Sequence, residues 1–208
     1  MTDEYRRRLY NDAAAYLISN SNSFASFADF LYTVTLEDGP GVAATDGKKF
    51  YIGLEFGRFN TAQRAFIIAH EINHIVLRHP WRGLGKDHYL WNIAADFVIN
   101  DVLHMREIPN IPLPGKPITI AEILGKAEGN DLEVPPNAVG RILYDPSLEP
   151  LPADEIYKML DAEAKKRGIR DIIIAYGKEG IIGGGDIIIS SHQQYGEDNI
   201  RRKEEDSE

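Results

Sequence analysis

The sequence predicts an α+β domain in which two long helices pack on a small mixed sheet. Three observations support this fold class. Residues 61–78 are apolar on nearly every side at helical spacing, residues 87–105 repeat that spacing, and two short strand-like runs flank Asp46-Gly47 upstream of both. We therefore expect a hairpin followed by a pair of long helices at the centre of the domain.

The composition is that of a globular domain and excludes several function classes. The 208 residues are 43% hydrophobic and 26% charged. With a net charge of −9, the chain lacks the excess of positive side chains that a general nucleic-acid binder needs. Cysteine is absent, which excludes disulfide scaffolds and thiolate nucleophiles, so a metal would need His, Asp or Glu ligands. No apolar run approaches the roughly 18 residues of a membrane span, and no apolar segment of a secretory signal follows the charged start. We expect a cytoplasmic protein with no nucleic-acid or membrane partner.

The N-terminal part combines helix and strand signals. Apolar residues recur at helical spacing over 3–19, with acidic residues in the first turn, where the positive end of a helix favours them. Residues 24–36 predict a short helix and then a strand. Asp46-Gly47 predicts a hairpin over 42–52 with a type I′ turn, which requires positive φ at both central residues.

Two long helices are expected next. Thr61 is the predicted N-cap of the helix over 61–78, and Pro80 ends it because proline also disfavours helical backbone at His79. The second helix is predicted over 87–105.

The C-terminal half begins with a change in composition. Nine of the eleven prolines lie in 109–152, which predicts a mostly extended connection with a short helix near 119–125. An amphipathic helix is predicted over 153–167, ended by Gly168. Two later DIII runs flank a glycine-rich stretch and predict a pair of strands. The expected parts are a main domain over 1–170 with its core at 24–160, a strand pair over 171–200 and a charged tail over 201–208.

An HExxH motif lies in the first long helix, at His70-Glu71-Ile72-Asn73-His74. Residues four apart share one helix face, with Cβ atoms about 5–6 Å apart, so His70 and His74 can bind one ion. Glu71 is turned by about 100° and cannot chelate with them, but it can reach a water held by the metal. Two ligands and a general base at this spacing are typical of a metallopeptidase helix.

The apolar surroundings of the motif favour a bound cation. Two imidazoles and a carboxylate inside such a helix cost free energy unless a partner satisfies them, and a divalent ion would do so. We therefore predict Zn²⁺ as the cofactor. The alternative is that His70 and His74 are ordinary helix residues with hydrogen-bond partners.

A catalytic zinc has three protein ligands and one water, so a third ligand is needed. Asp96 is the candidate, because it lies 22 residues beyond His74 in the apolar middle of the second helix, where a lone carboxylate needs a counter-charge. Its alternative role is to orient a ligating histidine. Asn92 and Asn100, in phase with Asp96, are interpreted as hydrogen bonders between packed helices. The other candidates for the third ligand are His79, His88, Asp101 and Glu107.

Four runs around the motif carry a family resemblance: VAATDGKKFYIGLEF, HEINHIVLRHPWR, LWNIAADFVIND and LYDPSLEPLPADEIYKML. Over roughly 40–160 they resemble the zinc metallopeptidase domain that usually precedes a von Willebrand A-like domain, a family placed among the zincins near the gluzincins. The resemblance implies a zincin-like fold in which His70, His74 and Asp96 bind zinc and Glu71 is the catalytic base. The second domain of that family is not in this sequence, which is interpreted as a stand-alone or truncated version. Asp145-Pro-Ser147, the nearest match to that domain's metal motif, is interpreted as a turn.

The predicted function is a zinc metallopeptidase acting on peptide or protein substrates, with an extended peptide aligned on the sheet edge near 42–52. An oxyanion donor is expected, and Tyr176, His192 and Tyr195 are candidates among which the sequence does not choose. The alternative is a catalytically silent binding or regulatory module on a zincin scaffold, with a structural zinc and a partner docked on 109–152. A third reading is an α+β domain without a metal. The oligomeric state is not predicted.

Overall fold

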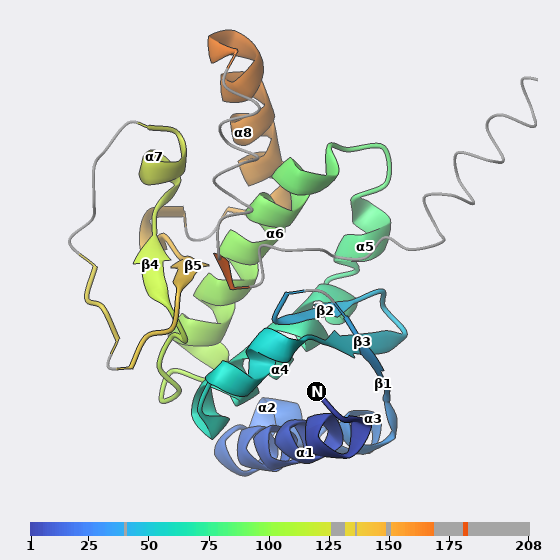
Figure 1. The fold of residues 1–208 in the computed structure, drawn as a ribbon. Helices are drawn as coiled ribbons and strands as arrows, with labels where there is room; N and C mark the ends of the chain where they lie inside the picture. Colours follow the sequence, from blue (N-terminus) through green and yellow to red (C-terminus); the bar gives the residue numbers. More distant parts are fainter. Residues whose placement is uncertain (40, 126–131, 136, 149–150, 169–180, 183–208) are drawn as a thin grey trace, which may run out of the picture.

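The structure is a computed structural model that describes residues 1–39, 41–125, 132–135, 137–148, 151–168 and 181–182. Figure 1 shows the arrangement of its helices and strands. In chain order they are α1 (Asp3–Asn20), α2 (Asn22–Ala25), α3 (Ala28–Thr33), β1 (Thr35–Asp38), β2 (Ala43–Thr45), β3 (Lys49–Ile52), η1 (Leu54–Arg58), α4 (Thr61–Val76), α5 (His79–Arg82), α6 (His88–Val102), η2 (Leu103–Glu107), β4 (Lys116–Ile118), α7 (Ile120–Ile123), β5 (Arg141–Leu143), η3 (Pro146–Leu148), α8 (Ala153–Arg167) and β6 (Ile181–Ile182).

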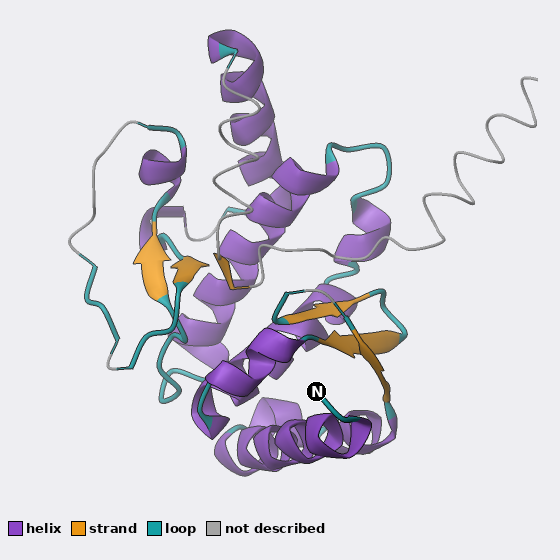
Figure 2. Ribbon diagram, viewed as in Figure 1, coloured by secondary structure: helices purple, strands orange, loops and turns teal. Residues whose placement is uncertain are grey.

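The α+β class predicted from the sequence is confirmed, but the strands form two sheets (Figure 2). The first sheet is mixed, with the order β1-β3-β2, and contains the predicted hairpin. The second sheet is parallel, with the order β4-β5-β6, and its first two strands come from the proline-rich segment that was predicted to be mostly extended connection. Pro117 is tolerated in β4 because β4 is an edge strand, where a missing N–H breaks no interior ladder.

The hairpin is confirmed, but the type I′ turn is wrong. Between the two strands, Gly47 has a positive φ of 89° but Asp46 does not, whereas a type I′ turn requires a positive φ at both central residues. The Asp46 carboxylate instead accepts hydrogen bonds from the backbone N–H groups of Lys48 and Lys49, at 2.8 and 2.9 Å, and so fixes the turn itself. Trp81 packs over this turn so closely that a Cβ on Gly47 would lie 2.5 Å from its ring.

The ends of α4 differ from the prediction. Its N-cap is Asn60, one residue earlier than expected, in a capping box with Gln63. Beyond the C-terminal end, Arg78 adopts a left-handed backbone with φ 57°, and His79 is the first residue of α5. The expected non-helical backbone at His79 is therefore wrong, because Pro80 occupies the first turn of a new helix, where no N–H is needed.

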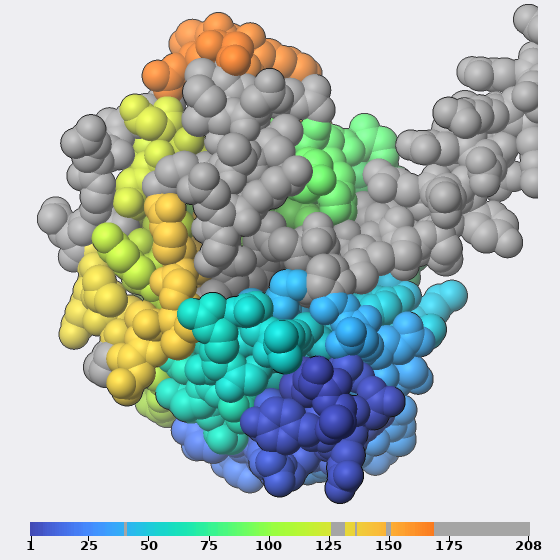
Figure 3. Space-filling model, in the orientation of Figure 1, coloured from blue at the N-terminus to red at the C-terminus, as the bar shows by residue number. Residues whose placement is uncertain are grey.

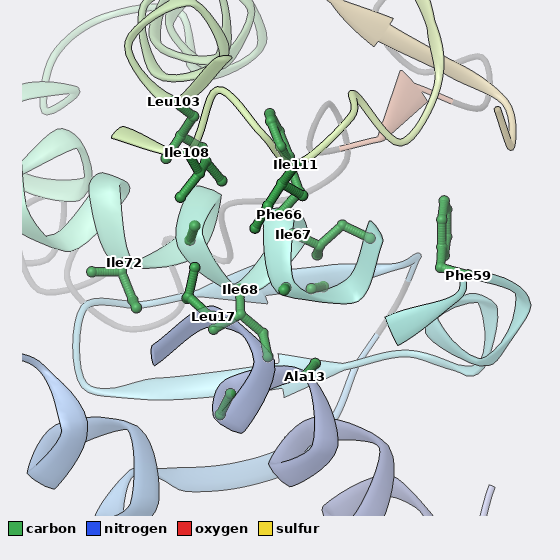
Figure 4. Close-up of a cluster of buried hydrophobic side chains, with 14 of the residues drawn as sticks. Ala13, Leu17, Phe59, Phe66, Ile67, Ile68, Ile72, Leu103, Ile108 and Ile111 are labelled. Carbon is green, nitrogen blue, oxygen red and sulfur yellow. The ribbon is translucent and has the colours of Figure 1, made fainter. Parts of the chain in front are cut away.

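Two apolar cores meet at α6. In the first core, α4 packs against α1 and the mixed sheet. Figure 4 shows Ile68 of α4 facing Ala13 and Leu17 of α1, while Leu103 and Ile108 lie on the other side of α4. The second core lies between α6, α8 and the parallel sheet. Helix α4 therefore has packing partners on both sides, which bury the apolar residues that cover nearly all of its surface.

The C-terminal elements are partly described. Helix α8 is confirmed over 153–167, with Gly168 at its C-cap in the left-handed conformation, and it lies at the end of the molecule opposite α1 in the view of Figure 3. The short helix predicted near 119–125 is α7. The two-residue strand β6 lies where a glycine-rich turn was predicted. The predicted strands at 171–174 and 186–189 and the tail lie outside the described residues, so the three-part division stays a prediction. None of the helices described combines the length and apolar character of a bilayer span.

Candidate metal centre

Three predicted ligands converge at the contact between α4 and α6. His70 and His74 lie on successive turns of α4, with their Nε2 atoms 2.9 Å apart. Oδ1 of Asp96, from α6, lies 3.3 Å from Nε2 of His70 and 3.1 Å from Nε2 of His74. Two ligand atoms about 2.0–2.1 Å from one zinc ion at a tetrahedral angle are about 3.3 Å apart. The three groups are therefore spaced to share one ion.

The burial of these groups supports the same interpretation. The exposed fractions are 3% for His70, 1% for His74 and 0% for Asp96. Within the described ranges, neither carboxylate oxygen of Asp96 has a hydrogen-bond partner. A fully buried carboxylate without such a partner is costly, and a divalent cation would compensate it while using both imidazole lone pairs. The donor set of two nitrogens and one oxygen fits zinc.

Asn100 fixes the tautomer of His70. The side-chain Nδ2 of Asn100 donates to the carbonyl of Leu143 at 2.7 Å, which leaves its Oδ1 as the acceptor facing Nδ1 of His70 at 2.8 Å. Nδ1 of His70 must then carry the hydrogen, and Nε2 presents a lone pair toward Asp96 and His74. The expectation that Asn100 hydrogen-bonds between packed helices is confirmed, and its partner is a predicted ligand.

His79 supports His74 in a similar way. The two Nδ1 atoms are 3.3 Å apart, and Trp91 Nε1 donates to the carbonyl of His79 at 2.9 Å. Burial, together with the charges of His74 and Arg82, lowers the pKa of His79 to about 2, so its ring is neutral and able to accept. A hydrogen bond from Nδ1 of His74 to His79 leaves Nε2 of His74 free for a metal.

The pKa values of the two central histidines move in opposite directions. Burial disfavours charge on His70, but the Asp96 carboxylate outweighs it and raises the pKa of that ring. Burial lowers the pKa of His74, and a charge on His70 adds to this, against the opposing effect of Asp96.

Glu71 is adjacent to the cluster but does not belong to it. Its side chain is buried, and it is not among the groups whose ligand atoms converge. Burial raises the pKa of Glu71 to about 7, with His70 opposing the shift and Asp96 adding to it. A carboxyl group with a pKa near neutrality is suited to general acid–base chemistry.

The other candidates for the third ligand have different surroundings. Glu107 accepts a hydrogen bond from Nδ2 of Asn73 at 3.0 Å, His88 begins α6, and Asp101 faces a separate cavity near α8. In the part of the chain that the structure describes, only His70, His74 and Asp96 form a group able to hold a metal. The predicted oxyanion candidates Tyr176, His192 and Tyr195 lie outside that part.

Asp145 is engaged in a turn, as the sequence predicted. Its Oδ1 accepts hydrogen bonds from the backbone N–H and the hydroxyl of Ser147, at 3.0 and 2.6 Å. Its Oδ2 accepts from the N–H of Ile120 at 3.1 Å. The carboxylate is thus used in joining η3 to the start of α7.

The chain was compared with protein families, with curated proteins and with solved structures. The model of a family described as a putative metallopeptidase domain matches residues 5–194. No curated protein and no solved structure matches the chain.

Proposed function

The chain belongs to this family of putative metallopeptidase domains, and from that premise we propose that it is a zinc-dependent peptidase that hydrolyses peptide or protein substrates. The observation that carries the proposal is the buried convergence of His70, His74 and Asp96 on one point. The zincin-like fold and the link to a von Willebrand A-like domain remain predictions.

The proposed ligands leave a position for chemistry. Three protein ligands are the usual number for a catalytic zinc, whereas structural zinc sites are closed by four. When bound, such an ion supplies Lewis-acid chemistry: it polarises a carbonyl and makes water a stronger nucleophile at neutral pH. Asn100 and His79 hold the two imidazoles in the tautomer that presents Nε2.

Glu71 is the proposed general base. It follows His70 directly on α4 and therefore lies beside the proposed ligands rather than among them. Its carboxylate would accept the proton of the attacking water and then deliver it to the leaving amine.

The position of the substrate is less defined. Strand β2 is an edge of the mixed sheet and packs against α4, as an aligning strand would. Its three residues are buried, so the alignment of an extended peptide on this edge stays a prediction. The cytoplasmic location and the absence of nucleic-acid and membrane partners are also predictions.

The test compares three proteins for bound metal and for cleavage of a mixture of unfolded proteins. Wild type should contain about one zinc per chain and cleave. Glu71→Gln should keep the zinc and lose cleavage, whereas His74→Ala should lose both. Cleavage retained in Glu71→Gln would refute the assignment of the base. Zinc without cleavage in wild type would favour the silent binding module instead.

A further inference from the structure

Asn73 lies between the two proposed histidine ligands in the sequence but on another side of α4. The helical repeat turns it by about 60° from His70, onto the flank of α4 opposite Glu71. The exposed fraction of Asn73 is 5%. A buried amide costs free energy unless its donors are satisfied, so Asn73 needs partners inside the protein.

The side-chain amide of Asn73 has two such partners. Its Nδ2 donates to the carbonyl of Ala69, one turn earlier on α4, at 3.2 Å, and to Oε2 of Glu107 at 3.0 Å. A carbonyl and a carboxylate oxygen both accept, which fixes the orientation of the amide. The bond to Ala69 stays within α4, whereas the bond to Glu107 ties α4 to another element. A hydrogen bond to a carboxylate belongs to the stronger, charge-assisted class.

The backbone at Glu107 is itself held in place. Glu107 ends η2, a turn of π-helix that continues α6 directly, and the N–H of Ile108 donates to the carbonyl of Leu103 across that turn at 2.9 Å. The hydroxyl of Ser21, at the start of α2, donates to the carbonyl of Glu107 at 3.3 Å. Leu103 and Ile108 pack beside α4 in the first core (Figure 4). Glu107 is therefore a firm anchor for Asn73.

The continuous segment of α6 and η2 thus contacts α4 on two sides. Asp96 and Asn100 meet the face that carries His70, and Glu107 holds the flank at Asn73. Two contacts at different angles around a helix fix its rotation about its own axis. Functional side chains must be held within about 0.5 Å and about 10–20° of the productive geometry. A small rotation of α4 would therefore be enough to move the imidazoles away from Asp96.

We propose that Asn73 and Glu107 are positioning residues, whose hydrogen bond fixes the rotation of α4. At that rotation, Nδ1 of His70 meets Asn100 and both imidazoles meet Asp96. The proposal rests on the proposed metal site and not on peptide cleavage. It gives a task to the fourth residue of the HExxH motif, which the assignments of the ligands and the base leave unused.

The test compares two variants of Glu107 with two measurements. Glu107→Gln keeps an oxygen acceptor on a side chain of the same length, whereas Glu107→Met removes it. The first measurement is the NMR signal of the Nδ1 proton of His70 in metal-free protein, which its bond to Asn100 protects from exchange with water. This signal should be present in wild type and Glu107→Gln and be lost in Glu107→Met. The second is zinc affinity, which should fall about tenfold or more in Glu107→Met and stay near that of wild type in Glu107→Gln.

Two further variants make the test specific. Glu155→Met removes the same charge from α8, where the carboxylate pairs with Lys158, and should change neither measurement. Asn73→Ser keeps a hydroxyl that can bond to the carbonyl of Ala69, but its side chain is too short to reach Glu107. Asn73→Ser should lose as much zinc affinity as Glu107→Met, and the double variant should lose no more than either alone.

Several outcomes would overturn the proposal. A purely structural role would lower the melting temperature of Glu107→Met and leave both the His70 signal and zinc affinity unchanged. Losses of zinc affinity that add up in the double variant would show that Asn73 and Glu107 act separately. If Glu107→Met does not fold, Asn73→Ser decides by the same measurements. Zinc binding without cleavage in wild type would refute the proposed peptidase but not this proposal, and if wild type binds no zinc, the His70 signal alone decides it.

Discussion

Oδ1 of Asn100 lies 2.8 Å from Nδ1 of His70, so an amide on α6 orients an imidazole on α4. The other end of the same amide donates to the carbonyl of Leu143, the last residue of β5 in the parallel sheet. One side chain therefore links the candidate metal centre to a strand from the proline-rich segment. Such links between a ligating histidine and its surroundings influence metal affinity.

Replacing Asn100 should weaken zinc binding without removing a ligand. We expect Asn100→Leu to lose about 10–100-fold in zinc affinity, because Nδ1 of His70 then lacks its acceptor. Asn100→Asp keeps an acceptor in the same place and should lose less. Competition with a chromophoric chelator measures both constants. Unchanged affinity in Asn100→Leu would show that this hydrogen bond does not orient His70.

His79 should behave as a supporting residue of the same kind. His79→Phe keeps a ring beside Trp91, whose centroid lies 5.7 Å away, but offers no acceptor to His74. We expect about a tenfold or greater loss of zinc affinity with little change in the fold. His88→Phe, on the first turn of α6, is the matched control and should bind zinc as wild type does. An equal loss in both variants would point to a general effect of histidine removal.

Removing the metal should destabilise the protein. A ligand that binds only the folded state adds about 2.7 kcal/mol to the free energy of unfolding when its concentration is 100 times its dissociation constant. We therefore expect zinc to raise the melting temperature of chelator-treated wild type and to leave that of Asp96→Ala unchanged. Scanning calorimetry with and without zinc measures this. A zinc-dependent rise that persists in Asp96→Ala would remove Asp96 from the ligand set.

Alanine substitutions at two glycines with positive φ distinguish the cost of backbone strain from the cost of steric overlap. Gly85 has φ 76° and open space around its Cα, so Gly85→Ala should cost only about 1–2 kcal/mol for the left-handed backbone. Gly47 has φ 89° and faces the ring of Trp81, so Gly47→Ala adds an overlap of about 1–3 kcal/mol to that cost. Urea unfolding compares the two variants. Equal losses of stability would mean that Trp81 moves aside freely.

Asp154 should stabilise the protein only above acidic pH. Partial burial disfavours its charged form, but Arg82 and Lys86 outweigh this and lower its pKa below the ordinary value. A carboxylate with a depressed folded pKa contributes stability above its unfolded pKa of about 3.9 and loses it as the pH falls through the folded value. Asp154→Asn should therefore be less stable than wild type at pH 7, by roughly 0.2–1 kcal/mol for a surface pair, and nearly equal once the pH lies below the depressed folded pKa. A constant difference across this range would contradict the ionic origin.

The position of the candidate metal centre follows from features that the sequence carries locally. The spacing of His70 and His74 on one helix face is a property of the helix alone, and Asp96 stands out as a lone carboxylate in an apolar run. The residues that hold those ligands depend on tertiary contacts. Asn100 lies one turn beyond Asp96 on the same face, but its partner is decided by how α6 crosses α4. His79 is buried in a new helix that starts at His79-Pro80, directly after α4 ends.

The parallel sheet could not be predicted for a related reason. Strands β4 and β5 are three residues long and lie among prolines, so local propensity indicates an irregular connection. Their pairing is stabilised by contacts that are distant in sequence, including the bond from Asn100 to Leu143. At the turn, the prediction failed for a local reason. The Asp46 carboxylate accepts a hydrogen bond from the N–H of Lys48, and this bond holds a turn other than the type I′ turn that Asp-Gly usually adopts.

The two imidazoles and the carboxylate come from different helices. Helix α4 carries both histidines by itself, while Asp96 reaches them only when α6 has docked between the two cores. An early folding intermediate with α4 formed but α6 undocked would offer an ion two donors and hold it weakly. Tight metal uptake would thus mark the moment at which the halves of the molecule join, and stopped-flow refolding in the presence of a cobalt chromophore would time that event.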